Sequence, residues 1–418
     1  MPEVLRPLPT LIAAVLASAC GFRLATADDL PAAQNPAQVD RGRYLATVAD
    51  CAACHTMPGG APFAGGRPIQ TPFGNVIAPN ITPDPESGIG NWSDADFDTA
   101  VRLGRSPQGK WLYPAMPFPY YTQMSRAEVL AIRAYLATVP AVHHAVRSDQ
   151  LPFPFDIRAS MRLWDALYLK VGPFRADPGR STQWNRGAYL VRGPAHCGAC
   201  HTPKNFLGGD VSAKPFWGAS AQGWFAPDIT ESLALGIGSW SVSDLVDYLK
   251  NGHNRFAAAS GPMGEEVSDS SSRMNDADLE AIAVYLKDQP GPANEAQPLG
   301  GREAIMVNGA ALYRDLCAAC HREDGAGVAY LIPDLAHSSS VAASDPVSLL
   351  HVVIHGAQSV ATEGEPTGPS MPAFGGQLDD AQVAAVTTYV RNSWGHAAPA
   401  TTLSAVRKAR APAVSAGG

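Results

Sequence analysis

The sequence predicts a mainly α-helical protein built from three tandem copies of one module. A five-residue pattern, Cys-x-x-Cys-His, occurs three times in 418 residues and uses six of the seven cysteines. Short helices with similar capping residues follow each copy, and their apolar positions recur at helical spacing. Because this self-similarity extends beyond the motif, it indicates a repeated structural unit. The copies are Cys51–His55, Cys197–His201 and Cys317–His321.

Each motif lies between two other repeated features. A predicted short helix leads into the cysteines and contains Gly42, Gly187 or Gly309. A proline-containing pattern follows the motif in every module, clearly in the first two and more loosely in the third. These patterns are Ala78–Thr82, Ala226–Thr230 and Ile332–Leu335.

A second helix in each module is predicted from its ends. Ser93 and Ser241 each have an aspartate three residues later, which is the spacing of a capping box. In the third module Asp345 is expected to cap and Pro346 to take the first helical position. A glycine with positive φ commonly closes a helix. The closing glycines are Gly104, Gly252 and Gly356.

The last helix of each module is predicted from a cap followed three residues later by an acidic or amide side chain. Apolar residues then recur at intervals of three and four, as on a helix with one face against a core. The caps are Ser125, Asn275 and Asp379. The residues just before them, Met124, Met274 and Leu378, are predicted to be hydrophobic staples.

Cys-x-x-Cys-His is the attachment pattern of c-type haem, in which two thiols form thioethers and the histidine ligates iron. A structural zinc site is the alternative, but it explains the cysteines and not the histidines. With 11 histidines in 418 residues, a histidine after all three pairs has a chance probability of roughly one in 50,000. We therefore predict three covalently bound haem c groups. Their thioethers are assigned to Cys51, Cys54, Cys197, Cys200, Cys317 and Cys320, and their histidine ligands to His55, His201 and His321.

Methionine is the usual second axial ligand in electron transfer, and aligning the modules selects candidates. Met124 and Met274 occupy equivalent positions, but the third module has Leu378 there, which cannot bind metal. Another methionine recurs in the Pro-rich loop before the last helix, where a core-filling role is the alternative. The predicted iron ligands are Met116, Met263 and Met371.

The N-terminus predicts export. A short charged region, an apolar run from Leu8 to Phe22 and an Ala-x-Ala site ending at Ala27 are typical of a cleaved secretory signal. Cys20 allows a second interpretation, lipid attachment after cleavage. The net charge of −7 argues against nucleic acid as a partner.

Between the first two modules, residues Ile157–Lys170 predict an amphipathic helix with Ile157, Met161, Trp164, Leu167 and Tyr168 on one side. It is expected to pack between domains, with contact to a membrane surface as the alternative. The predicted boundaries are signal peptide 1–27, first domain 28–150, linker 151–180, second domain 181–290, linker 291–304, third domain 305–396 and a disordered Ala-rich tail 397–418.

Taken together, these segments resemble the three-haem cytochrome c subunits of bacterial membrane-bound dehydrogenases that act on alcohols, gluconate, fructose, sorbitol or aldehydes. Besides the motifs, the matching segments are Trp111–Pro117 and Gly368–Phe374, and the resemblance runs from about Val39 to Trp394. It implies three tandem class I cytochrome c domains, small and helical, with long loops wrapping covalent haem.

The resemblance also implies two contacts in each domain. The first and last helices should cross where a glycine meets an aromatic ring, pairing Gly42 with Tyr135, Gly187 with Tyr285 and Gly309 with Tyr389. The carbonyls of Pro79, Pro227 and Pro333 should accept a hydrogen bond from His55, His201 and His321, which would make each imidazole a stronger ligand.

The predicted function is electron transfer. Iron with histidine on one face and methionine on the other has no open position, so the haems can only change oxidation state. The expected partners are a flavin- or pyrroloquinoline-quinone-dependent catalytic subunit as donor and ubiquinone or a terminal oxidase as acceptor. The expected place is the periplasmic side of the bacterial inner membrane, with the chain at the membrane surface. Two other hypotheses are a haem peroxidase, which needs one haem without methionine, and a free-standing soluble shuttle.

Overall fold

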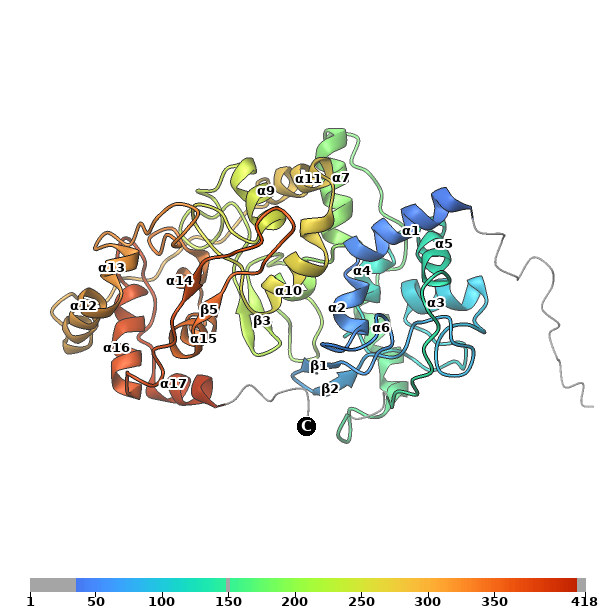
Figure 1. Cartoon of the computed structure of the whole chain (residues 1–418), viewed down its shortest axis with the longest axis horizontal. Coiled ribbons are helices and arrows are strands. Elements are labelled where there is room, and N and C mark those ends of the chain that lie inside the picture. Colours follow the sequence, from blue (N-terminus) through green and yellow to red (C-terminus); the bar gives the residue numbers. More distant parts are fainter. Residues whose placement is uncertain (1–34, 148–150, 412–418) are drawn as a thin grey trace, which may run out of the picture.

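The computed structural model describes residues 35–147 and 151–411. The predicted signal peptide, Cys20 and residues 412–418 lie outside this part. The described chain is mainly helical, as the sequence predicts, with three antiparallel two-stranded ribbons. Three groups of helices follow one another along the longest axis of the molecule, running from blue to red in Figure 1. None of the described helices combines the length and the apolar composition needed to cross a bilayer.

We refer to the three groups as units 1, 2 and 3. Unit 1 contains α1 (Pro36–Val48), α2 (Cys51–His55), β1 (Pro68–Thr71), β2 (Gly74–Ile77), α3 (Asp94–Leu103), α4 (Phe118–Tyr121) and α5 (Arg126–Leu136). The connection to unit 2 contains η2 (Arg158–Ser160) and α6 (Met161–Tyr168). Unit 2 contains α7 (Thr182–Arg192), α8 (Gly198–His201), β3 (Ala219–Ala221), β4 (Trp224–Ala226), α9 (Val242–Asn251), α10 (Pro262–Asp269), η3 (Ser271–Arg273) and α11 (Asp276–Leu286). Unit 3 contains α12 (Ala304–Leu316), α13 (Ala318–His321), α14 (Ser339–Ala342), α15 (Val347–His355), β5 (Ala357–Gln358), β6 (Ser370–Met371), α16 (Asp380–Val390) and α17 (Leu403–Arg410).

In every unit the first long helix crosses the last one at a glycine. A Cβ atom added to Gly42, Gly187 or Gly309 would lie 1.8, 1.9 or 2.3 Å from a carbonyl oxygen of the partner helix. The implied tyrosine contact is present at the second and third crossings, where the added atom would lie 2.8 Å from Tyr285 and 2.6 Å from Tyr389. At Gly42 the three nearest atoms belong to Ala131 and Ile132 instead of Tyr135. The close approach of backbones therefore recurs in all three units.

Most of the predicted helix ends are found. Four caps, Ser93, Ser125, Ser241 and Asp379, form complete capping boxes. The glycines that close α3, α9 and α15 have φ of 64°, 79° and 75°. The start of α15 was predicted one residue too early, because Pro346 is the cap and the Asp345 carboxylate accepts from the Val347 N–H at 2.9 Å.

The connecting helix α6 is shorter than predicted and buries only part of the predicted side. Trp164 and Met161 point inward, and the Trp164 indole N–H donates to the Leu207 carbonyl at 2.9 Å. Ile157 and Leu167, predicted for the same side, are exposed. The buried face depends on the Leu207 loop, which belongs to unit 2 and is remote in the sequence.

The prediction of a disordered tail is wrong for residues 397–411. Here α17 buries Val406 and Ala409 against the core of unit 3. Arg410 donates to the Gly375 carbonyl at 2.6 Å and to the Asp380 carboxylate at 2.7 Å. The helix was missed because only three of its residues, Ala405, Val406 and Ala409, pack against the core, and its remaining contacts are polar and distant in sequence.

Units 1 and 2 share a buried interface. Tyr44 and Val48 of α1 pack into the core of unit 2. The Tyr44 hydroxyl donates to Asp278 at 2.5 Å and accepts from the Asn275 amide at 2.6 Å. Arg186 makes two hydrogen bonds of 2.7 Å to the same carboxylate. A charged network therefore holds the two units in one arrangement.

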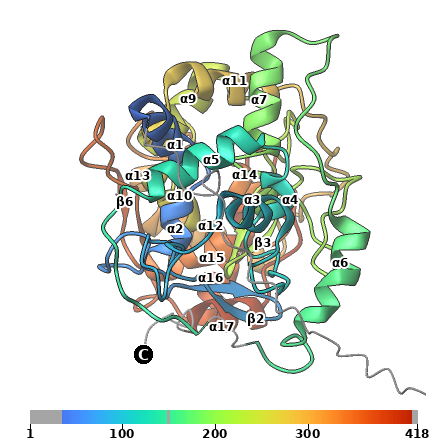
Figure 2. The same ribbon diagram turned by 90° about the vertical axis from the view of Figure 1, so that its right-hand side faces the viewer.

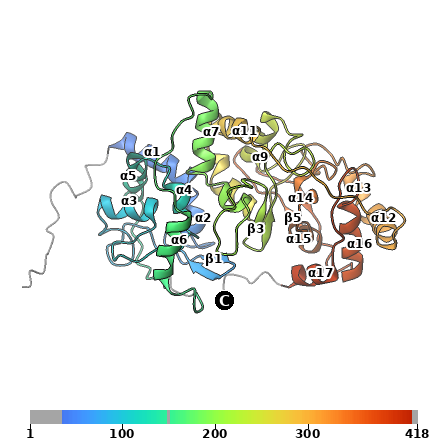
Figure 3. The ribbon, with the colours of Figure 1, turned by 180° about the vertical axis from the view of Figure 1, so that it is seen from behind.

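Units 2 and 3 meet along β4 and α15. Trp224 stacks on His351 with ring centres 4.8 Å apart. The Ser348 hydroxyl accepts from the Phe225 N–H at 2.9 Å and donates to the Phe225 carbonyl at 3.0 Å. Seen from behind, the three units form one continuous row (Figure 3).

Candidate haem sites

The first motif forms the single turn of α2, so the side chains of Cys51, Cys54 and His55 project from the same short helix. Nδ1 of His55 lies 2.7 Å from the carbonyl oxygen of Pro79. Since a carbonyl can only accept, Nδ1 carries the proton and Nε2 keeps a free lone pair. The imidazole is thus held in the tautomer that binds metal through Nε2.

The same contact recurs in the other two units. Nδ1 of His201 lies 2.7 Å from the Pro227 oxygen, and Nδ1 of His321 lies 3.1 Å from the Pro333 oxygen. Burial lowers the pKa of all three imidazoles, which favours the neutral, metal-binding form. The hydrogen bonds implied by the family resemblance are all present.

The six motif cysteines are free thiols. Burial raises the pKa of Cys51, Cys54 and Cys197 to about 12 and that of Cys317 to about 11. A thioether is neutral, so these buried surroundings suit cysteines that are covalently bound to haem.

Cys51, Cys54, His55 and Met116 line one cavity of about 2410 Å³. Its other walls in unit 1 are mainly aliphatic and aromatic, which suits a large flat macrocycle. The cavity continues into unit 2, where Cys200, Trp217 and Tyr285 are among its lining residues. Among the apolar wall residues are Ile81, Trp92, Phe97, Val101 and Leu112. The predicted ligands of the first site thus face one space that could hold haem.

The other two predicted methionine ligands lie in different settings. Met371 is on β6 and packs with Cys317 against the core of unit 3, as Met116 packs with Cys51 in unit 1. Met263 was predicted in a loop, but it lies in the first turn of α10. Cys197 packs against the core of unit 2, and Met263 is not among the side chains that do so. The structure therefore brings thiol and methionine to a common core in units 1 and 3 only.

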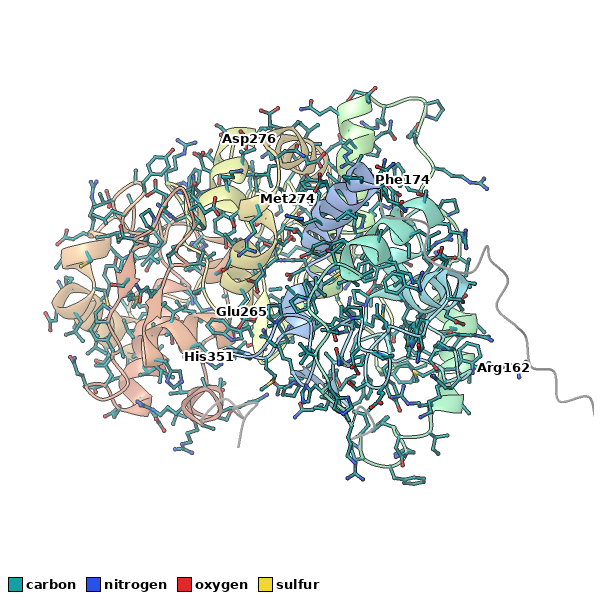
Figure 4. All side chains as sticks on the ribbon, turned by 45° about the vertical axis from the view of Figure 1, so that its right-hand side comes forward. Arg162, Phe174, Glu265, Met274, Asp276 and His351 are labelled. Atoms are coloured by element: carbon teal, nitrogen blue, oxygen red, sulfur yellow. The ribbon has the colours of Figure 1, made fainter. Side chains whose placement is uncertain are left out.

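Sequence analysis missed a group of carboxylates where α10 meets α2. Burial raises the pKa of Glu266 to about 7, and burial together with Glu266 raises the pKa of Asp50 well above its usual range. Glu265 pairs with Arg67 of unit 1 at 2.5 Å, and its place at this junction is labelled in Figure 4. Only the contact between α10 and α2, which are far apart in sequence, brings these groups together.

His196 is a second missed feature of this interface. Its ring lies 5.6 Å from the ring of Tyr121 in an edge-on contact. Burial lowers its pKa to about 4. A backbone φ of 36° marks the tight turn that leads into Cys197. From sequence this histidine had no counterpart in the other modules, so its position offered no signal.

Comparison with known proteins decides the family. A cytochrome c family model matches residues 39–140 and 306–394. The chain is 39% identical over 388 residues to the gluconate 2-dehydrogenase cytochrome c subunit of Pantoea cypripedii, covering 88% of each chain. The chain belongs to the dehydrogenase cytochrome c subunits. As a member of this family it holds haem c covalently and transfers electrons.

Two further relatives of the cytochrome c subunit extend over almost its whole length. The cytochrome c subunit of alcohol dehydrogenase (quinone) from Gluconacetobacter polyoxogenes is 36% identical, covering 98% of this chain and 91% of that protein. The fructose dehydrogenase cytochrome subunit of Gluconobacter japonicus is also 36% identical, covering 97% and 90%. Unit 2, outside the matched residues of the family model, has the same helix crossing and the same histidine contact as the other units.

Proposed function

We propose that this cytochrome c subunit is a three-haem relay between a catalytic dehydrogenase subunit and the respiratory chain. The observation that carries the proposal is the triple recurrence of one site: two thiols and an imidazole on a short turn, with Nδ1 held by a proline carbonyl. Each unit is then one class I cytochrome c domain, with the boundaries 28–150, 181–290 and 305–396.

Haem supplies a reversible one-electron change at iron, and the protein controls access to it. The proline carbonyls keep each histidine neutral and oriented. Met116 and Met371, which share a core with Cys51 and Cys317, would be the second iron ligands in units 1 and 3 and would leave no position for substrate. Met263 is assigned the same role in unit 2 from its place in the repeat. The cysteines would hold the haem covalently.

The donor in this proposal is a flavin- or pyrroloquinoline-quinone-dependent subunit that oxidises an alcohol, a sugar or an aldehyde. The names of the relatives support an alcohol or a sugar as the substrate. The acceptor is ubiquinone or a terminal oxidase. The proposed location is the periplasmic side of the inner membrane, and the signal-like N-terminus supports it, with lipid attachment at Cys20 as the alternative to cleavage after Ala27.

The test combines haem counting with ligand substitution. Alkaline pyridine spectra of the purified holoprotein should give three haems per chain. Met116→Ala, Met263→Ala and Met371→Ala should each convert one haem to a form that binds cyanide or carbon monoxide readily, detected in optical spectra. Met124→Leu, which alters a buried methionine not assigned to iron, is the matched control and should leave all haems unreactive.

Three results would count against the relay. Fewer than three haems would remove one site, and a reactive haem in the unmodified protein would favour the peroxidase hypothesis. Isolation from membranes with no flavoprotein or quinoprotein subunit would favour a free shuttle.

A further inference from the structure

Two consecutive tyrosines of α4 contact the chain at two different motifs. The hydroxyl of Tyr121 donates to the carbonyl of Ala49, two residues before Cys51, at 2.7 Å. The ring of Tyr121 also lies edge-on to the ring of His196, with centres 5.6 Å apart, and His196 directly precedes Cys197. Tyr121 therefore contacts the chain at the start of the first motif and of the second.

Tyr120 packs against the second motif itself. This motif has a glycine at position 198, where the other two motifs have alanine. A Cβ atom added to Gly198 would lie 3.2 Å from both the ring edge and the hydroxyl of Tyr120, which is closer than an ordinary contact. The hydroxyl donates to Asp210 at 2.5 Å, and Lys204 joins that carboxylate to the Gly198 carbonyl, to which it donates at 2.9 Å. Glycine in this motif thus leaves room for a side chain of unit 1.

The tyrosine pair lies at the join of units 1 and 2. Tyr121 is buried in the core of unit 1, against which Cys51 packs, and Tyr120 is half-buried. Both tyrosines line the same cavity as Cys54 and Cys200. Figure 2 shows α4 beside α3 and inside the outline of the molecule. Bonded and packed atoms of the pair therefore connect the first two motifs.

We propose that Tyr120 and Tyr121 form the route by which the first two haem sites exchange electrons. Electron tunnelling weakens less steeply through bonded and closely packed atoms than across empty space, and a packed interior supplies such contacts. One electron leaves the iron of one site and reaches the iron of the other, while the tyrosines keep their electrons and their hydroxyl protons. Burial raises the pKa of both hydroxyls, which favours the protonated form. The inference rests on the proposed function, because it requires haem at the first two sites.

The test measures electron exchange in the half-reduced, full-length holoprotein by two-dimensional exchange NMR of the haem methyl signals. Tyr121→Leu removes the ring and the bond to Ala49, so exchange between the first two sites should slow. Tyr121→Phe loses only the bond and should slow exchange less, which keeps the test decisive if the leucine variant fails to fold. Tyr120→Leu should also slow exchange, whereas Tyr120→Phe keeps the ring against Gly198 and should retain most of the native rate.

Tyr168→Leu is the matched control. This tyrosine lies in the connection between units 1 and 2, but it packs on Trp164 and Gly209 rather than on a motif, so its loss should leave exchange unchanged. In every variant, exchange between the second and third sites should equal that of the native protein. The midpoint potentials of the haems, measured by redox titration, should also be unchanged, because they would move only if a substitution displaced a haem.

Native exchange rates in both leucine variants, Tyr120→Leu and Tyr121→Leu, would overturn the proposal. So would an equal loss in Tyr168→Leu, or a loss accompanied by changed potentials, because the tyrosines would then act only through packing. Haem counting on the same samples separates this inference from the relay. Three haems with unchanged exchange refute only the route, whereas a haem missing from the first or second site refutes both.

Discussion

Gly187→Ala tests the claim that the helix crossing of unit 2 is set by backbone contact. The added Cβ would lie 1.9 Å from the Ala281 carbonyl oxygen and 2.8 Å from Tyr285. An ordinary contact for such an atom begins at 3.4 Å. Helices α7 and α11 would therefore have to separate at the point where they support Cys197 and the core of unit 2.

The direction of the stability change in Gly187→Ala distinguishes a close helix crossing from an open helical position. At an unobstructed helical position, replacing glycine with alanine stabilises a protein by about 1 kcal/mol. Overpacking typically costs 1–3 kcal/mol, and here the obstruction is backbone, which no change of rotamer relieves, so we take about 3 kcal/mol. The net expectation is a loss of about 2 kcal/mol, or a fall in Tm of roughly 8–16 °C for a unit of about 100 residues.

The assay is thermal unfolding of the holoprotein followed by far-ultraviolet circular dichroism and haem absorbance. Gly301→Ala is the control, because a Cβ there has nothing within 4 Å, and its effect should stay within about 0.5 kcal/mol. A Gly187→Ala protein that is as stable as the native one, or more stable, would refute the close crossing.

Three other predictions concern the interface, the tail and pH. Tyr44→Phe removes the hydroxyl that bonds to the charged network between units 1 and 2, so the free energy of unfolding measured in denaturant titrations should fall by about 1–2 kcal/mol. Tyr330→Phe, at an exposed position, is the control and should leave it unchanged. Val406→Asp puts a charge at a fully buried position of α17 and should cost at least about 3 kcal/mol and make residues 403–411 sensitive to protease, whereas Lys408→Asp should not. Burial holds the pKa of His196 near 4 in the folded protein, whereas its pKa is about 6.5 in the unfolded chain. Between these values the unfolded chain binds more protons, so stability is lost as the pH falls from about 6.5 to 4. His196→Phe should remove up to about 3 kcal/mol of that loss in denaturant titrations across this range, and equal pH dependence in both proteins would contradict the burial of His196.

Features encoded by neighbouring residues could be predicted from the sequence. Caps such as Ser93 and Ser125 bond to groups three residues away, so spacing alone identifies them. The Pro79 contact of His55 came from family resemblance, since nothing local relates residues that far apart. The docking of α17 and the exposure of Leu167 on α6 were predicted wrongly, because the partners of Val406 and Trp164 come from other parts of the chain. For the same reason the sequence did not reveal the group of carboxylates where α10 meets α2, since these helices are far apart in the chain.

The rigid join between units 1 and 2 has a consequence for electron transfer. Cys54 and Cys200 line one cavity, and Tyr121 bonds to the Ala49 carbonyl and contacts His196, so the anchoring turns of the first two sites are neighbours. Cys320 of the third site is exposed and lies outside that cavity. Val48, within the core of unit 2, leaves little freedom for the first two units to move apart. In the proposed three-haem relay, electron exchange between the first two sites would depend on a separation fixed by folding, and an interface substitution such as Tyr44→Phe should disturb that step before it affects the third site.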